Sequence, residues 1–273
     1  MKRRLFCEIH PFTYAIAVKR MRFIKRVKNL LSGDKFARSK RDPLPHLVHK
    51  HALRMRRTTG DIDLQLQENK ATNLTIAASA VNGILIKPGE VFSFWHLVGD
   101  CTKRKGYKEG LIISLGTSTQ GIGGGMCQFT NLLHWLVLHS PLDIIEHHHH
   151  DGFDMFPDYD RQVPFGCGTS IMYNYLDYRF KNNTNFTFQI IVYTTETHLC
   201  GELRASDVLP LSYHILEEDA HFTKIDEVYY RRNTIVKKVI DKHTGNETNR
   251  TIIKKSNAKV LYDEEFINKD LLR

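Results

Sequence analysis

The chain has 273 residues and a mass of 31.7 kDa, with 41% hydrophobic and 25% charged residues. This composition is typical of a globular protein, and it excludes a mini-protein, a collagen-like chain and a chain that is disordered throughout. The formal net charge of +9 is typical of proteins that bind nucleic acid or an acidic surface. However, residues 1–58 carry 17 Lys and Arg against three acidic residues (+14), whereas residues 59–273 carry 22 against 27 (−5). The basic charge therefore belongs to the N-terminal segment.

This basic segment predicts an amphipathic helix, because apolar residues recur at helical spacing between Tyr14 and Leu31 with basic residues between them. Such a helix suits an anionic membrane surface, a nucleic acid or a weak contact with the rest of the protein. No base-reading motif is present, so nucleic acid is not expected as a partner. The apolar stretch after the charged start is interrupted by Glu8, His10 and Pro11. We therefore expect no signal peptide and no transmembrane helix, and a cytoplasmic protein at the inner face of the membrane.

The cysteines are five in number and widely spaced, without a CxxC pair: Cys7, Cys101, Cys127, Cys167 and Cys200. This spacing predicts neither a disulfide framework nor a structural zinc cluster, so reduced thiols are expected. No cofactor and no bound metal are expected, and the oligomeric state is left open.

The next part of the chain predicts alternating helix and strand segments. Residues 69–82 have helical spacing, with Gly83 placed as a C-terminal cap. Residues 84–95 contain two strand-like runs around Pro88-Gly89, which predicts a hairpin or a strand corner. Residues 110–116 predict a further strand. Met126 starts the apolar face of another helix, which Ser140-Pro141 ends.

The remaining segments predict β-structure. In residues 142–150, alternation places Glu146, His148 and His150 on one face and His147 and His149 on the other. A β-meander is expected over residues 169–183, 185–195 and 198–206, and a C-terminal hairpin around Thr244-Gly245-Asn246. The fold class is therefore α+β, with one or two helices packed on a mainly antiparallel β-sheet. The predicted divisions are a basic, partly helical extension (1–58), a central domain (59–210) and a hairpin extension (211–273).

The glycine-rich run at residues 121–128, GIGGGMCQ, is the strongest candidate for a functional site. Glycines before a helix allow a ligand or another chain segment to approach the backbone, and they leave N–H groups that favour negative charge. The run lacks the features of a Walker loop or a dinucleotide fingerprint. Cys127 lies in the first helical turn, where the helix dipole lowers the pKa of a thiol. It could serve as a nucleophile, or it could be a small buried residue in tight packing.

A nucleophilic Cys127 needs a base, and His134 is about 10 Å along the same helix, too far for a direct pair. Glu146 and His150 could share a site in which the carboxylate orients the imidazole. A zinc site is the alternative, formed by His148 and His150 together with Cys127 or Asp177. Asp177 could instead form a surface ion pair with Arg179. A third possibility is acid/base cleavage of a glycan by Glu90 or Glu146 with Asp177, which requires carboxylates ~5–10 Å apart in one cleft.

Over residues 65–205 the chain resembles the VanW family. The resemblance rests on four segments in family order: NLTIAASAVNGILIKPGEVFSFW, GYKEGL, GIGGGMCQFTNLLHWLVLHSPLDIIE and FGCGTSIMYNYLDYRFKNNT. The positions that match the family motif are Glu90, Gly123, Gly124, Gly125, Cys127, Gln128, Glu146, His150 and Asp177. The chain departs from the motif at His147, where the family usually has Arg.

The resemblance implies an accessory protein of cell-envelope and peptidoglycan metabolism that is linked to glycopeptide (vancomycin) resistance. It implies a peptidoglycan-related ligand, bound or modified near Gly123, Gly124, Gly125, Gln128 and Glu90. Whether the protein is an enzyme stays open. The alternative is a cysteine-dependent hydrolase or acyltransferase acting on a cell-wall peptide, with Cys127 as nucleophile, His150 as base, and Glu146 or Asp177 orienting the base.

Overall fold

The computed structural model describes residues 5–56, 63–114, 117–149, 152–155, 157, 161–173 and 175–273. In this part of the chain the α-helices are α1 (Pro11–Leu31), α2 (Leu64–Val81), α3 (Phe94–Val98) and α4 (Met126–Leu138). Short 3-10 helices span Phe6–Glu8, Lys103–Lys105, Glu264–Phe266 and Lys269–Leu271. No helix formed by the described residues is both long enough and apolar enough to cross a membrane.

The central sheet has the order β2-β11-β10-β3 and is antiparallel throughout. Its strands are β2 (His46–Arg54), β3 (Ile84–Ile86), β10 (Phe188–Thr194) and β11 (His198–Ala205). Alternate residues of β11 are buried, and its Gly201 lies under α4. A Cβ atom at Gly201 would lie 3.0 Å from side-chain carbons of both Leu132 and Leu136. The missing side chain therefore lets α4 pack closely on the sheet.

A second sheet has the order β1-β4-β9-β7. It consists of β1 (Lys35–Phe36), β4 (Glu90–Ser93), β7 (Asp143–Glu146) and β9 (Arg179–Lys181). The rings of Phe92 and Phe180 stack across β4 and β9 with centroids 4.6 Å apart. One hydrophobic core joins this sheet to α2, α4 and the central sheet. Burial of this core is the main source of the stability of the fold.

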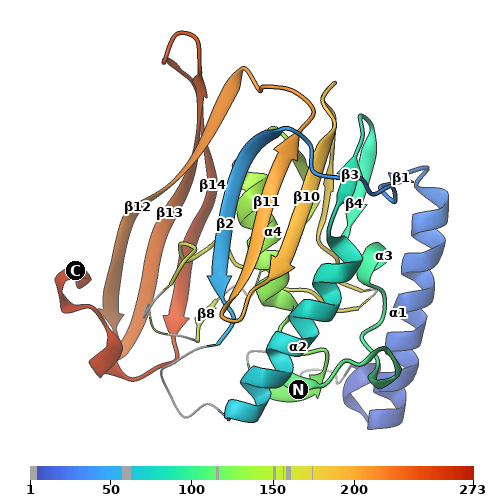
Figure 1. Cartoon of the computed structure of the whole chain (residues 1–273). Coiled ribbons are helices and arrows are strands. Elements are labelled where there is room, and N and C mark those ends of the chain that lie inside the picture. Colours follow the sequence, from blue (N-terminus) through green and yellow to red (C-terminus); the bar gives the residue numbers. More distant parts are fainter. Residues whose placement is uncertain are drawn as a thin grey trace.

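A third sheet is built from long C-terminal strands and has the order β12-β13-β14-β8. Its strands are β12 (Leu211–Ile225), β13 (Val228–Asp241), β14 (Glu247–Val260) and the short β8 (Phe153–Asp154). A separate hairpin pairs β5 (Glu109–Ser114) with β6 (Thr117–Ile122). Figure 1 shows the long-stranded sheet on one side of the molecule and α1 on the opposite side.

The fold class is α+β, as the sequence predicts. The predicted helices at residues 14–31, 69–82 and from Met126 are confirmed, as is the hairpin turn at Thr244–Asn246. Of the two alternatives for residues 84–95 the strand corner is correct, because β3 and β4 pair in different sheets. The meander prediction is wrong for its first segment. The described residues 169–173 and 175–178 form only the isolated bridge between Met172 and Leu176, and β9 pairs with β4 and β7 rather than with β10.

The divisions predicted at residues 58 and 210 stay predictions. Two strands from the basic N-terminal segment pair with strands of the body, β1 with β4 and β2 with β11. The C-terminal part adds the long strand β12 to the predicted hairpin of β13 and β14.

Candidate functional site

A cleft of about 1810 Å³ lies where the start of α4 meets α2, β14 and residues 161–173. The glycine-rich run forms part of its wall, through Gly123, Gly125, Cys127 and Gln128. Four of the residues that the sequence singles out are therefore brought together at one surface. Gly124 is buried behind them.

The glycines allow close packing of the chain against itself. A Cβ atom at Gly124 would lie 2.3 Å from the carbonyl carbon of Gly110, and one at Gly125 would lie 2.5 Å from Cγ of Lys70. At Gly123, where φ is +82°, a Cβ would lie 2.4 Å from Cβ of Cys101. Contacts this short exclude any side chain. The close approach of a neighbouring segment thus explains each glycine: β5 lies against Gly124, α2 against Gly125, and the residues after α3 against Gly123.

Cys127 is the second residue of α4. The residue as a whole is partly exposed, but its thiol group is buried. Burial raises the pKa of this thiol, and hydrogen bonding with the backbone of Ile171 and of Cys127 itself offsets only part of that rise. The pKa shift is opposite in direction to the one expected for a thiol at a helix start, because desolvation of the thiolate outweighs these hydrogen bonds. All five cysteines are free, in agreement with the prediction of no disulfide.

We expect Cys127 to react slowly with iodoacetamide at neutral pH, with a rate that still rises above pH 9, because only the thiolate attacks. At pH 7 the expected rate is at least ~tenfold below that of a free thiol such as glutathione. Mass spectrometry of labelled peptides measures it, and the urea-unfolded chain is the control. A titration midpoint well below pH 8 at Cys127 alone would contradict this expectation and favour the nucleophile.

Polar side chains on α4 connect the cleft wall to its surroundings. The Gln128 Nε2 group donates to the carbonyl oxygen of Arg54 (2.7 Å), which ties α4 to β2. The Oδ1 atom of Asn131 accepts from the backbone N–H (2.7 Å) and the hydroxyl (2.9 Å) of Thr169. These bonds hold the segment after residue 161 against the first two turns of α4.

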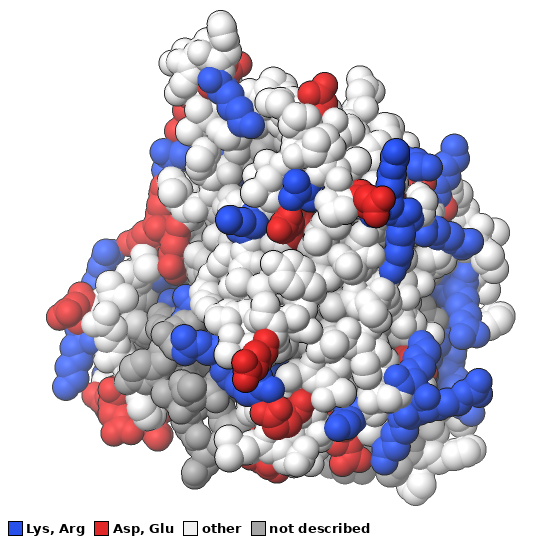
Figure 2. Space-filling view, viewed as in Figure 1, with Lys and Arg blue, Asp and Glu red and all other residues white. Residues whose placement is uncertain are grey.

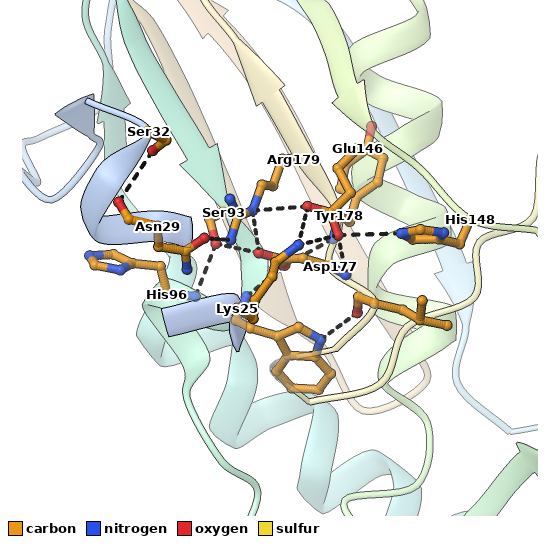
Figure 3. Close-up of polar contacts among 12 residues, drawn as sticks. Lys25, Asn29, Ser32, Ser93, His96, Glu146, His148, Asp177, Tyr178 and Arg179 are labelled. Atoms are coloured by element: carbon orange, nitrogen blue, oxygen red, sulfur yellow. Dashed lines mark hydrogen bonds and ion pairs between the residues drawn. The ribbon is translucent and has the colours of Figure 1, made fainter. Parts of the chain in front are cut away.

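Asp177 is at the centre of a buried network beside the second sheet (Figure 3). Its Oδ2 accepts from the Ser93 hydroxyl (2.5 Å) and from Arg179 Nε (2.7 Å). Its Oδ1 accepts from the backbone N–H groups of Trp95 (3.0 Å) and Tyr178 (2.9 Å). The carboxylate therefore accepts four hydrogen bonds and holds the first turn of α3 against β9. The ion pair of Asp177 with Arg179 is present as predicted, but it is buried and not on the surface.

Glu146 extends this network to α1. Its Oε1 accepts from the backbone N–H of Asp177 (3.0 Å), and its carboxylate contacts Lys25 Nζ at 2.5 and 2.6 Å and Arg179 Nε at 3.3 Å. Burial alone would raise the pKa of Glu146, but Lys25, the Asp177 N–H and Arg179 together lower it. His148 contacts the same carboxylate at 3.3 Å, so the predicted shared face of Glu146 and His148 is confirmed.

The residues predicted as a catalytic set are not gathered at the cleft. Among the described residues that line it are Cys127 and His149, and neither Glu146 nor Asp177 is one of them. His150, the predicted base, lies outside the described residues. The roles assigned to Cys127, His150, Glu146 and Asp177 stay predictions.

Glu90 closes the turn that begins at Lys87. Its Oε2 accepts from the Lys87 N–H (2.8 Å), and its own N–H donates to the Lys87 carbonyl (2.9 Å). Asn182 N–H donates to the Glu90 carbonyl (3.0 Å). These contacts position the Pro88-Gly89 corner, and Glu90 is not among the described residues at the cleft.

Half-buried rings of the histidine run contact the buried His134 of α4. The ring of His147 lies 4.0 Å from that of His134 and 3.9 Å from that of His149, so His147 and His149 share the predicted face. Burial and the neighbouring imidazoles lower the pKa of His147 to about 4. The described residues contain no group of three or more His, Cys, Asp or Glu side chains that could hold a metal ion.

Two residues that contact the network of Asp177, Glu146 and Arg179 could not be identified from sequence patterns alone. Lys25 lies 121 residues before Glu146, and Asn29 lies 150 residues before Arg179, whose Nη2 donates to it (2.9 Å). A basic residue on an amphipathic helix is normally solvated, so nothing in the sequence marks Lys25 as a buried partner. For Ser93 the sequence does contain a signal: a serine before a short apolar run is typical of a helix N-cap, and Ser93 is the N-cap of α3.

The fold and these sites define an α+β protein with a glycine-rich helix start in the wall of a cleft and a buried carboxylate pair beside it. The chain belongs to the VanW family. A family model described as VanW like protein matches residues 69–204. The chain is 32% identical over 219 residues to the vancomycin B-type resistance protein VanW of Enterococcus faecalis (strain ATCC 700802 / V583). That match covers 80% of this chain and 79% of the relative.

A second relative is the uncharacterized protein YoaR of Bacillus subtilis (strain 168). It is 31% identical over 121 residues, which are 43% of this chain and 37% of YoaR. No solved structure matches this chain.

Proposed function

We propose that this protein contributes to vancomycin resistance by binding a peptidoglycan-related ligand in the cleft at the start of α4. The similarity to a vancomycin B-type resistance protein supports the biological role. The observation that carries the molecular part is that the motif residues Gly123, Gly125, Cys127 and Gln128 all line one cleft.

The size and charge of the cleft support an extended, anionic ligand. Its volume of about 1810 Å³ exceeds the roughly 300–1,000 Å³ of most small-molecule pockets. Among the described residues that line it, seven are Lys or Arg and four are Asp: Arg22, Arg54, Arg56, Lys70, Arg161, Lys254 and Lys255 against Asp63, Asp100, Asp154 and Asp263. A muropeptide carries carboxylates and polar sugar and amide groups, which complement such a surface.

Direct binding of purified soluble muropeptides, followed by titration calorimetry, tests this proposal. We expect saturable binding, and we expect Lys70→Glu with Lys255→Glu to weaken it at least ~tenfold, because both charges line the cleft. The matched control is Lys269→Glu, an exposed charge reversal away from the cleft, which should leave the Kd unchanged. Absence of saturable binding, or equal weakening by the control, would refute the proposal.

A further inference from the structure

Helix α1 lies on the body with its polar side inward. Lys25 contacts Glu146, and Asn29 accepts from Arg179, both through side chains that face the second sheet (Figure 3). Arg22 lies over the Tyr173 ring at 4.8 Å and 3.7 Å from Asp100. Ala17, Val18 and Ile24 are also half-buried. A surface helix normally buries only its apolar side, so the inward position of polar side chains on α1 is unusual.

The outer side of α1 carries an apolar stripe, which Lys19 and Arg20 interrupt between Ile16 and Phe23. Phe12, Phe23 and Leu30 are 68%, 67% and 83% exposed, and Ile16 and Val27 are exposed between them. Their spacings of four, seven, four and three residues place all five on one face of the helix. Isolated exposed apolar residues are ordinary, but a stripe along a whole helix marks an interaction surface.

The same helix is strongly basic and has no acidic residue. Besides the inward Arg22 and Lys25, it presents Lys19, Arg20, Arg26 and Lys28 on its exposed sides, and no ion pair found among the described residues involves these four. Figure 2 shows Lys and Arg gathered along the side of the molecule where α1 lies. An apolar stripe bordered by positive charge is the pattern of a helix that lies in a lipid headgroup region.

We propose that the outer face of α1 is a docking surface for an anionic lipid bilayer. The apolar residues enter the boundary between headgroups and acyl chains, while the basic residues contact lipid phosphates. A nucleic acid would leave the stripe exposed to water. A second copy of this chain would bring two basic helices together, which charge repulsion opposes. The ion pair of Lys25 with Glu146 fixes α1 against the second sheet. The stripe therefore faces away from the protein before any lipid binds.

Co-sedimentation of the full chain with phosphatidylcholine vesicles, with and without phosphatidylglycerol, tests the proposal. We expect binding only to the anionic vesicles, and weaker binding as salt is added. Lys19→Gln with Arg26→Gln should weaken partitioning roughly 25-fold, because each basic residue near an anionic surface contributes roughly fivefold. Phe23→Ser with Leu30→Ser should weaken it at least ~tenfold, because both side chains are among the most exposed on the stripe.

The matched controls change similar residues elsewhere. Val208→Ser with Ile252→Ser removes two apolar side chains that are 60% and 54% exposed, and Lys50→Gln with Lys269→Gln removes two exposed charges. Both controls should bind vesicles as the parent does. Equal binding to neutral and anionic vesicles, or no loss in the stripe variants, would overturn the proposal. So would a concentration-dependent dimer that Phe23→Ser with Leu30→Ser abolishes, because a second copy would then cover the stripe.

Discussion

Replacing Asp177 with alanine should lower the free energy of unfolding by about 3–5 kcal/mol, the range for breaking one side of a buried ion pair. The substitution removes the closer of two carboxylates that contact the Arg179 guanidinium, which is almost fully buried: Asp177 lies at 2.7 Å and Glu146 at 3.3 Å. It also removes the acceptor of the Ser93 hydroxyl and of two backbone N–H groups at α3 and β9. Each unsatisfied buried donor carries its own desolvation cost. Urea denaturation followed by circular dichroism measures the loss.

Glu68→Ala is the matched control for the Asp177 substitution, because it breaks an exposed ion pair with Arg56 on a helix that tolerates alanine. The expected change is small compared with that of Asp177→Ala, because solvent screens an exposed ion pair. Asp177→Ala combined with Arg179→Met should recover part of the loss, because no unpaired charge then stays buried. If Asp177→Ala costs no more than Glu68→Ala, the network does not hold α3 and β9 together.

The sequence could predict those elements whose cause is local. The helix from Met126 follows from apolar residues at helical spacing, and the turn at Thr244–Asn246 follows from turn residues between two β-rich runs. Residues 169–178 are rich in Tyr and apolar residues and predict a strand, yet the described residues 169–173 and 175–178 are irregular. There Trp95 N–H and Nε1 donate to Asp177 and to the Leu176 carbonyl. Such long-range donors override β-propensity, and no local pattern shows them.

In the candidate site, too, local features could be predicted from the sequence and long-range contacts could not. Alternation along the strand correctly placed Glu146 with His148 and His147 with His149. The glycine run predicts the close approach of a ligand or of another chain segment, and the structure shows chain segments, at Gly110, Lys70 and Cys101, in that space. Both uses require the same missing Cβ atom, so the sequence cannot distinguish them. The hydrogen bond between the Cys127 thiol and the backbone of Ile171 likewise joins residues that are distant in sequence.

Two half-buried histidines predict a loss of stability in mild acid. His49 of β2 stacks on His139, which follows α4, with ring centroids 3.8 Å apart. Burial, together with the neighbouring histidines, lowers the pKa of both to about 4. In the unfolded chain these imidazoles titrate near 6.5, so between pH 6.5 and 4 the unfolded state binds more protons. Stability is therefore complete above pH 6.5 and is lost as the pH falls toward 4, by on the order of 1 kcal/mol per histidine at pH 5.

Thermal melts at pH 7 and at pH 5 measure this effect, and we expect the Tm of the parent to fall by several degrees. His49→Gln with His139→Gln should reduce the fall, because the glutamines carry no charge in acid.

The groups that face this pair are His51 and His214, and Lys237 also faces His139; all would repel added positive charge. The control is His198→Gln, because the imidazole of His198 contacts the exposed Thr197 hydroxyl. This variant should leave the fall in Tm unchanged. An equal fall in parent and double variant would assign the acid sensitivity to other groups, such as the buried pair of His134 and His147. Because His49 belongs to β2 and His214 to β12, charging this cluster should act first on the contact between the central sheet and the C-terminal sheet.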